Sequence, residues 1–96
     1  MIIRNYRTTD YEAVVGILKE GKIFDPAWET RDNLERKVQR DPESILVAEV
    51  DGQVVGNVFY MEDGWTAFIF RLAVRKEFQN QGIASRLQLE AENKLR

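Results

Sequence analysis

The sequence predicts an α+β domain, in which a short strand and two helices precede an antiparallel three-strand meander and a final helix. Apolar residues recur at helical spacing in the first forty residues, and from Ser44 onward they gather in runs rich in Val, Ile and aromatic residues. Asp51-Gly52 separates two such runs and is typical of a tight hairpin turn, because both central residues of that turn need positive φ. The expected element order is therefore β-α-α-β-β-β-α.

The first strand and the first helix are predicted from local signals. Residues 2–6 form a short β-type run. Thr9 and Glu12 have the spacing of a capping box, in which the hydroxyl bonds the amide three residues on and the carboxylate reaches back. A helix should follow this box and end at Gly21, since glycine is frequent just after a helix.

A second helix is expected to begin at Asp25-Pro26, because Asp is a good cap and Pro fits the first turn. Asp41-Pro42 should end it, since proline cannot continue a helix. Its apolar stripe is narrow, so this helix should lie loosely on the surface; the stripe consists of Trp28, Leu34 and Val38.

Three strands and a helix complete the predicted fold. The first two strands, 45–50 and 53–61, flank the hairpin turn, and Glu62-Asp63-Gly64 forms a second turn before a strand over residues 65–74. The last helix is expected to begin near Ile83. Its inner stripe should consist of Ala84, Leu87, Ala91 and Leu95.

The strand over residues 65–74 is apolar on both faces. Simple alternation places Phe68, Phe70, Leu72 and Val74 on one face, and Trp65, Ala67, Ile69 and Ala73 on the other, where Arg71 interrupts. Such a strand is normally covered on both sides, yet only one helix follows it. Because an exposed apolar edge promotes association, we expect a homodimer formed through the 65–74 edge.

Composition excludes several classes of function. The 96 residues are 44% hydrophobic and 31% charged, the balance of one globular domain, with a formal charge of −2. The chain lacks the basic field of a nucleic-acid-binding protein and any apolar stretch long enough for a membrane. With neither Cys nor His, we expect no disulfide, thiolate nucleophile, Ser-His-Asp triad or zinc site built on those residues. A carboxylate-only site for Mg or Ca stays formally open, but no EF-hand-like spacing of acids is present, so we expect no metal. Patterned sequence begins at Met1 without a signal peptide, which favours the cytoplasm.

Residues 72–87 read as a strand, a polar loop, a glycine and the first turn of a helix. The first N–H groups of a helix have no internal partners and lie at its positive dipole end. Gly82 allows a ligand to approach the backbone closely, so the segment suits a phosphate or pyrophosphate. The same arrangement is also an ordinary strand-to-helix connection, and the glycine and the helix start alone favour that simpler interpretation.

The segment contains Gln79-Asn80-Gln81-Gly82-Ile83-Ala84, preceded by Leu72-Ala73-Val74 and by Phe78. This string resembles motif A of the GNAT superfamily, the acetyl-CoA-dependent N-acetyltransferases, whose signature is Gln/Arg-x-x-Gly-x-Gly/Ala. The resemblance covers the whole chain but only part of the family's domain. We therefore expect a single domain over residues 1–96, truncated or naturally short, that lacks the carboxy-terminal strands and helix.

The resemblance implies a binding site for acetyl-CoA as a co-substrate. Backbone atoms of Leu72, Ala73 and Val74 would meet the pantetheine arm and the acetyl carbonyl, at a bulge in this strand. Main-chain N–H groups, with one serine, would hold the pyrophosphate; these residues are Gln79, Asn80, Gln81, Gly82, Ile83, Ala84 and Ser85. Arg75 would either approach the phosphates of the nucleotide or be a solvated charge at the strand end.

The resemblance also implies direct attack of a primary amine on the thioester, which needs neither Cys nor His. The glutamate that some members carry before motif A is absent here, where the strand reads Ile69-Phe70-Arg71. The catalytic residues are therefore unknown, with Glu62 and Asp63 as weak candidates. No tyrosine takes the family's usual acid position, because all precede motif A: Tyr6, Tyr11 and Tyr60.

Three hypotheses on function stay open at this point. The first is an amine acetyltransferase, or only its coenzyme-binding half, whose acceptor is a protein amino terminus, a lysine, a polyamine or a drug. The second is a non-catalytic module that binds coenzyme A or another pyrophosphate ligand. The third is a structural dimer whose loop binds nothing.

Overall fold

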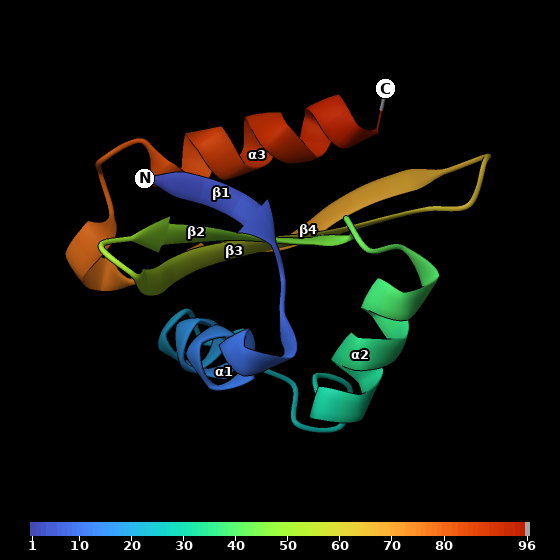
Figure 1. The fold of residues 1–96 in the computed structure, drawn as a ribbon, viewed down its shortest axis with the longest axis horizontal. Helices are drawn as coiled ribbons and strands as arrows, with labels where there is room; N and C mark the ends of the chain where they lie inside the picture. The colour runs from blue at the N-terminus through green and yellow to red at the C-terminus, as the bar shows by residue number, and fades with distance from the viewer. Residues whose placement is uncertain (96) are drawn as a thin grey trace.

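The computed structural model describes residues 1–95. It contains a four-stranded antiparallel sheet with helices on both faces (Figure 1). The strands lie in the order β1 (Ile2–Asn5), β2 (Ile45–Val50), β3 (Gln53–Glu62) and β4 (Ala67–Val74). α1 (Tyr11–Glu20) and α2 (Arg31–Arg40) cover one face, and α3 (Ile83–Lys94) covers the other (Figure 1). Two short 3-10 turns, η1 (Thr8–Asp10) and η2 (Lys76–Phe78), precede α1 and α3. The predicted fold class and element order are confirmed.

Two apolar cores lie on the two faces of the sheet. The core beside α1 and α2 contains Tyr6, Val14, Ile17, Leu18, Leu34, Ile45, Val47, Val54 and Phe59. The core beneath α3 contains Leu46, Ala48, Val55, Val58, Tyr60, Ile83, Leu87 and Ala91. Strands β2 and β3 supply side chains to both cores, because successive residues of a strand point to opposite faces. Among residues 1–95, no helix has the length and apolarity needed to cross a membrane.

The two hairpin turns form where they were predicted. Asp51 and Gly52 have φ values of 51° and 78°, which joins β2 to β3 in the expected tight turn. The second turn is longer than predicted, so β4 begins at Ala67 instead of residue 65. The reason is that the Asp63 carboxylate accepts the amides of the next residues: Trp65 (2.9 Å) and Thr66 (2.7 Å).

The start of α1 differs from the predicted capping box. The amide of Arg7 donates to Asp10 Oδ2 at 2.8 Å, and this contact forms the 3-10 turn that leads into α1. Thr9 is exposed and the predicted Thr9–Glu12 box is not formed, because Asp10 takes the capping role. The helix ends before Gly21, as predicted.

The predicted start of the second helix was wrong by several residues. α2 begins at Arg31, where the Thr30 hydroxyl caps the helix by accepting the Asn33 amide at 3.1 Å. The preceding segment instead forms a turn, because the Asp25 carbonyl accepts the amide of Glu29 at 2.8 Å. Trp28, predicted on the apolar stripe, lies in this turn and is 71% exposed. The helix ends at Arg40, before Asp41-Pro42, as predicted.

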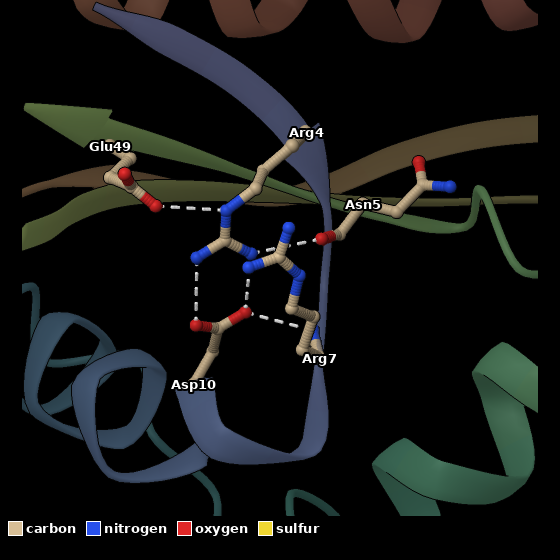
Figure 2. A network of polar contacts seen from close by, with 5 residues as sticks. All are labelled: Arg4, Asn5, Arg7, Asp10 and Glu49. Carbon is tan, nitrogen blue, oxygen red and sulfur yellow. Dashed lines mark hydrogen bonds and ion pairs between the residues drawn. The ribbon is translucent and has the colours of Figure 1, made fainter. Parts of the chain in front are cut away.

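An ionic network ties β1 to the sheet and to α1 (Figure 2). The Arg4 guanidinium donates to both oxygens of Asp10, at 2.8 and 3.0 Å, and to Glu49 of β2 at 2.9 Å. Burial alone would raise the pKa of Asp10, but the hydrogen bonds from Arg4 and from the Arg7 amide outweigh it and lower that pKa. The network therefore holds Asp10 as a carboxylate at the entrance to α1.

A bulge interrupts the pairing of β4 with β3. Asn57 of β3 pairs with Ala73 of β4, and Phe59 pairs with Phe70. Between these two pairs β3 has one residue and β4 has two, so β4 carries one extra residue. Arg71 lies at this point with a φ of 53°, a left-handed backbone that is unusual for a residue with a side chain.

This extra residue changes the faces predicted for β4 by simple alternation. Phe70 and Ala73 both pack in the core beside α1 and α2, whereas Ile69 and Val74 pack in the core beneath α3. The prediction that Phe70 and Val74 share a face was wrong, because one extra residue reverses the alternation beyond it.

The inner stripe of α3 is also shifted relative to the prediction. Ile83, Leu87 and Ala91 are buried against the sheet, whereas Ala84 is exposed. Ala84 therefore lies on the exposed side of the first turn of α3, and Leu95 packs at the margin of the core as predicted.

Candidate functional site

A cavity of about 320 Å³ lies where β4 ends and α3 begins. We call it the cradle pocket, and its lining is Val74, Phe78, Gln79, Asn80, Gly82, Ile83, Ala84 and Ser85. None of these residues is acidic. The Gln79 side chain closes the loop by donating from Nε2 to the Val74 carbonyl at 3.0 Å.

The backbone of the cradle pocket presents a row of free donors. Asn80 and Gly82 have φ values of 66° and 81°, and the space beside Gly82 is open, because a Cβ atom there would meet no atom within 4 Å. Within the described chain, the amides of residues 80–85 donate to no acceptor, and Arg86 is the first to bond back, to the Gly82 carbonyl at 3.1 Å. Free amides at the positive end of a twelve-residue helix favour an anion such as phosphate.

The structure brings together most of the residues that the motif predicted. Val74, Gln79, Asn80, Gly82, Ile83, Ala84 and Ser85 all line the cradle pocket. Gln81 lies in the same loop without lining the pocket, and Leu72 and Ala73 lie earlier in β4, where Leu72 is 37% exposed and Ala73 packs on the core. Phe78 is an additional lining residue; it precedes the motif, and nothing in its spacing predicted this role.

Arg75 is not the solvated charge that was one of its two predicted roles, because its side chain is only 23% exposed. Its guanidinium packs against α1 at Gly16, so closely that a Cβ atom added to Gly16 would lie 2.9 Å from Arg75 Nη2. It also pairs with Glu20 at 3.4 Å, and the same carboxylate accepts the Lys76 amide at 2.5 Å. Arg75 therefore fastens the end of β4 to α1 and does not line the cradle pocket.

A second, larger cavity of about 580 Å³ lies between α2 and the β3–β4 hairpin. We call it the groove. Apolar side chains in its wall include Trp28, Leu34, Phe59 and Phe70, and charged ones include Glu29, Arg36, Lys37, Arg40, Asp41, Glu62 and Asp63. An apolar wall with several charged groups is typical of a site that binds an organic substrate.

β4 connects the two cavities. Phe70 lines the groove, Val74 lines the cradle pocket, and the bulge at Arg71 lies between them. A ligand extended along this short stretch of strand would reach from one cavity to the other. The bulge that the resemblance implied is therefore present at the expected strand.

Lys37 places a half-buried amine on the groove wall. Its Nζ donates to the Tyr60 carbonyl at 2.6 Å and lies 5.2 Å from the centroid of the Phe70 ring. Burial lowers the pKa of Lys37, and nearby Asp41 opposes that shift.

The two weak catalytic candidates, Glu62 and Asp63, lie together at the rim of the groove. Glu62 accepts the Gly64 amide at 3.0 Å, and Asp63 accepts the turn amides described above. Hydrogen bonds from the backbone of Thr66 and Trp65 lower the pKa of Asp63, which makes it a weak base. Across residues 1–95, no group of three or more acidic side chains is arranged to hold a metal ion.

Comparison with known proteins shows which family the chain is similar to. The model of the acetyltransferase (GNAT) family matches residues 4–96. Acetyltransferases of Pectobacterium atrosepticum and of Photorhabdus laumondii are each 37% identical to the chain over 95 residues, which is 99% of it. The chain spans 67% and 66% of the lengths of these two relatives, or about two thirds.

Solved structures share the fold. The PaiA N-acetyltransferase of Thermoplasma acidophilum, in complex with coenzyme A, superposes with a TM-score of 0.80 at 21% identity, covering 96% of this chain and 69% of that one. Ard1 of Thermoplasma volcanium has a TM-score of 0.76 at 28% identity, covering 91% of this chain and 57% of that one. On the family match and the curated relatives, the chain belongs to the GNAT family of acetyltransferases.

Proposed function

We propose that this chain binds acetyl-CoA at the cradle pocket and that the protein transfers the acetyl group to a primary amine. The observation that carries the proposal is the row of free amides at residues 80–85, around Gly82, in a pocket without acidic residues. A diphosphate needs several donors at once, and this backbone presents them without any side-chain rearrangement. We place this activity in the cytoplasm, where acetyl-CoA is available.

Each part of the co-substrate has a place along this surface. The free amides of residues 80–85 and the Ser85 hydroxyl bind the pyrophosphate, whereas the Gln79 amide already donates to the Lys76 carbonyl at 3.3 Å. The backbone of Leu72, Ala73 and Val74 receives the pantetheine arm and directs the acetyl group toward the groove. The family membership and the coenzyme A complex of the PaiA structure support this assignment.

The acceptor amine enters from the groove and attacks the carbonyl carbon of the thioester directly. A C–N bond forms and the C–S bond breaks, so that the amide and coenzyme A are the products. The amine loses a proton to a base, and the departing thiolate gains one. Glu62 and Asp63 border the groove and remain the candidates for that base, with Asp63 the weaker because its pKa is lowered.

Calorimetric titration with acetyl-CoA tests the binding step. Ser85→Glu places a carboxylate in the cradle pocket, and Gln88→Glu adds the same charge one turn further along α3, outside the lining. We expect Ser85→Glu to weaken binding by about tenfold, since one added charge near two phosphates costs about 1–2 kcal/mol at this exposure. Gln88→Glu should bind within about twofold of the wild type. Absent heat with the wild type, or equal loss in both variants, would refute the assignment.

Transfer itself is tested separately, with radiolabelled acetyl-CoA and a panel of peptides, lysine derivatives and polyamines. Label in any amine supports an acetyltransferase. Binding without transfer would instead support the non-catalytic module that the sequence left open.

We also propose that the protein forms a homodimer through the edge of β4. β4 is the last strand of the described sheet, and exposed apolar side chains border it: Trp65 at 92%, Phe68 at 59% and Leu72 at 37%. Sedimentation at micromolar concentration should show a dimer that Phe68→Lys dissociates. A monomeric wild type would contradict this proposal and leave the binding assignment intact.

A further inference from the structure

Arg71 adopts a conformation that its own side chain does not favour. Its φ of 53° lies in the left-handed region, which residues other than Gly, Asn and Asp rarely enter. Such a conformation persists only when the surrounding structure enforces it, and it is found most often at functional sites. The contacts that enforce it here come from two separate elements.

Asn57 of β3 holds the main chain of Arg71. Its Nδ2 donates to the Arg71 carbonyl at 2.8 Å, in place of a regular strand-to-strand contact. The Asn57 side chain is completely buried, and its Oδ1 has no hydrogen-bond partner in the described part of the protein. A buried amide with one half unsatisfied destabilises a core, and the hydrogen bond that its other half makes to Arg71 offsets part of that cost.

Glu29 holds the side chain of Arg71. Its Oε2 lies 3.3 Å from Arg71 Nε, and its Oε1 accepts the Asp25 amide at 2.7 Å. Tyr11 of α1 donates its hydroxyl to the Glu29 carbonyl at 2.7 Å. The carboxylate is only 8% exposed, so the segment between α1 and α2 is joined to the bulge through a largely buried ion pair.

The position of this network matters because the bulge separates the two cavities. Phe70, before it, lines the groove, and Val74, after it, lines the cradle pocket. Removal of the extra residue from the register would turn the Val74 side chain from the α3 face to the opposite face. Glu29 itself lines the groove, so the network borders the cavity proposed for the acceptor and also holds the bulge that precedes the cradle pocket.

We propose that Asn57, Arg71 and Glu29 are positioning residues, which hold the bulge of β4 so that Val74 and the cradle pocket face the coenzyme while Phe70 faces the acceptor. The inference rests on the proposed function for its consequence in binding. Its structural part, that the left-handed Arg71 sets the faces of Val74 and Phe70, stands independently of any ligand.

Two substitutions at one position separate the bulge from the ion pair. Arg71→Gly removes the guanidinium but adopts positive φ freely, whereas Arg71→Val removes the guanidinium and disfavours positive φ. We expect Arg71→Gly to bind acetyl-CoA within about threefold of the wild type, and Arg71→Val to bind about tenfold more weakly. Equal affinities of the two variants, whether both normal or both weak, would overturn the role of the bulge.

A structural measurement keeps the test informative for any binding result. A Cβ atom added to Gly56 would lie 3.2 Å from Val74 Cγ2 and 3.1 Å from Leu87 Cδ1. The two methyl groups are therefore close enough to each other to give a nuclear Overhauser contact. This contact should persist in Arg71→Gly and disappear in Arg71→Val. Persistence in both variants would overturn the inference. Wild-type protein that shows the contact but binds no acetyl-CoA would refute the proposed function alone.

The two anchors are tested by near-isosteric changes. Asn57→Asp replaces the donor with a carboxylate that faces the Arg71 carbonyl, and it should lower affinity as Arg71→Val does. Glu29→Gln keeps an oxygen for the Asp25 amide and loses the ion pair. Combined with Arg71→Gly, the Glu29→Gln change should have no further effect on affinity, because the guanidinium that pairs with Glu29 is already absent. An undiminished effect of Glu29→Gln in that combination would remove Glu29 from the network.

Discussion

Gly56 of β3 lies where both β4 and α3 approach the strand closely. It has no positive φ, so its backbone suits any residue, but a side chain there would meet three neighbours. A methyl group would lie 3.1 Å from Leu87 Cδ1 and 3.2 Å from both the Ala73 carbonyl oxygen and Val74 Cγ2. Gly56→Ala therefore tests whether α3 is seated on the sheet as described.

The expected magnitude follows from these distances. Carbon atoms pack favourably at about 3.5–4.0 Å, so the neighbours must retreat by roughly half an ångström. Overpacking of this kind costs about 1–3 kcal/mol, and replacing a strand glycine regains about 0.5–1 kcal/mol of conformational entropy. We expect Gly56→Ala to lower the free energy of unfolding by about 1–2 kcal/mol.

Urea unfolding followed by circular dichroism measures this change, with Gly21→Ala as the matched control. A side chain at Gly21 would make only ordinary contacts of 3.6–3.7 Å, so that variant should equal or slightly exceed the wild type in stability. Adding Leu87→Val removes the nearest clashing carbon, so the double variant should lose about 1 kcal/mol less than the sum of the single changes. Full stability of Gly56→Ala, or strict additivity with Leu87→Val, would refute this description of the α3 interface.

Two further predictions concern the first half of the chain. Because the pKa of Asp10 is lowered in the folded state, its contribution to stability should be complete above the pKa of an unfolded aspartate, about 3.9, and be lost as the pH falls through the lowered value. Urea unfolding at pH 7 and pH 3 should therefore show a larger acid-induced loss in the wild type than in Asp10→Asn, and equal losses would contradict the Arg4 network. Thr30→Ala should cost about 1 kcal/mol by removing the cap of α2, whereas Thr9→Ala should cost almost nothing. The reverse ranking in thermal unfolding would support the capping box predicted from sequence.

Elements with strong local signals could be predicted from the sequence. The Asp51-Gly52 turn, the end of α1 at Gly21 and the start of α3 at Ile83 all depend on residues within a few positions of each other. The loop of the cradle pocket was predictable for the same reason, because its glycine and helix start are adjacent in the chain. The start of α2 was not, since Asp25 and Pro26 favour a turn as readily as a helix, and the Glu29 contacts decide between them.

Features that depend on distant contacts were missed. Arg71 is the one charged residue among the apolar residues of β4, and nothing local indicated that a bulge there would reassign the faces of the strand. The bulge depends on Asn57, fourteen residues earlier, and on Glu29, forty-two residues earlier. Neither residue has a motif around it, and a buried asparagine or glutamate becomes visible only when the strands and the α1–α2 connection are placed together.

The central claim is that the backbone amides at the start of α3 bind the diphosphate of acetyl-CoA. Titration of acetyl-CoA into ¹⁵N-labelled protein, followed by amide chemical shifts, tests it at the atoms concerned. We predict that the largest shifts occur at residues 80–85, with smaller ones at Leu72 and Val74. An unchanged loop, or shifts confined to another face of the protein, would contradict the claim.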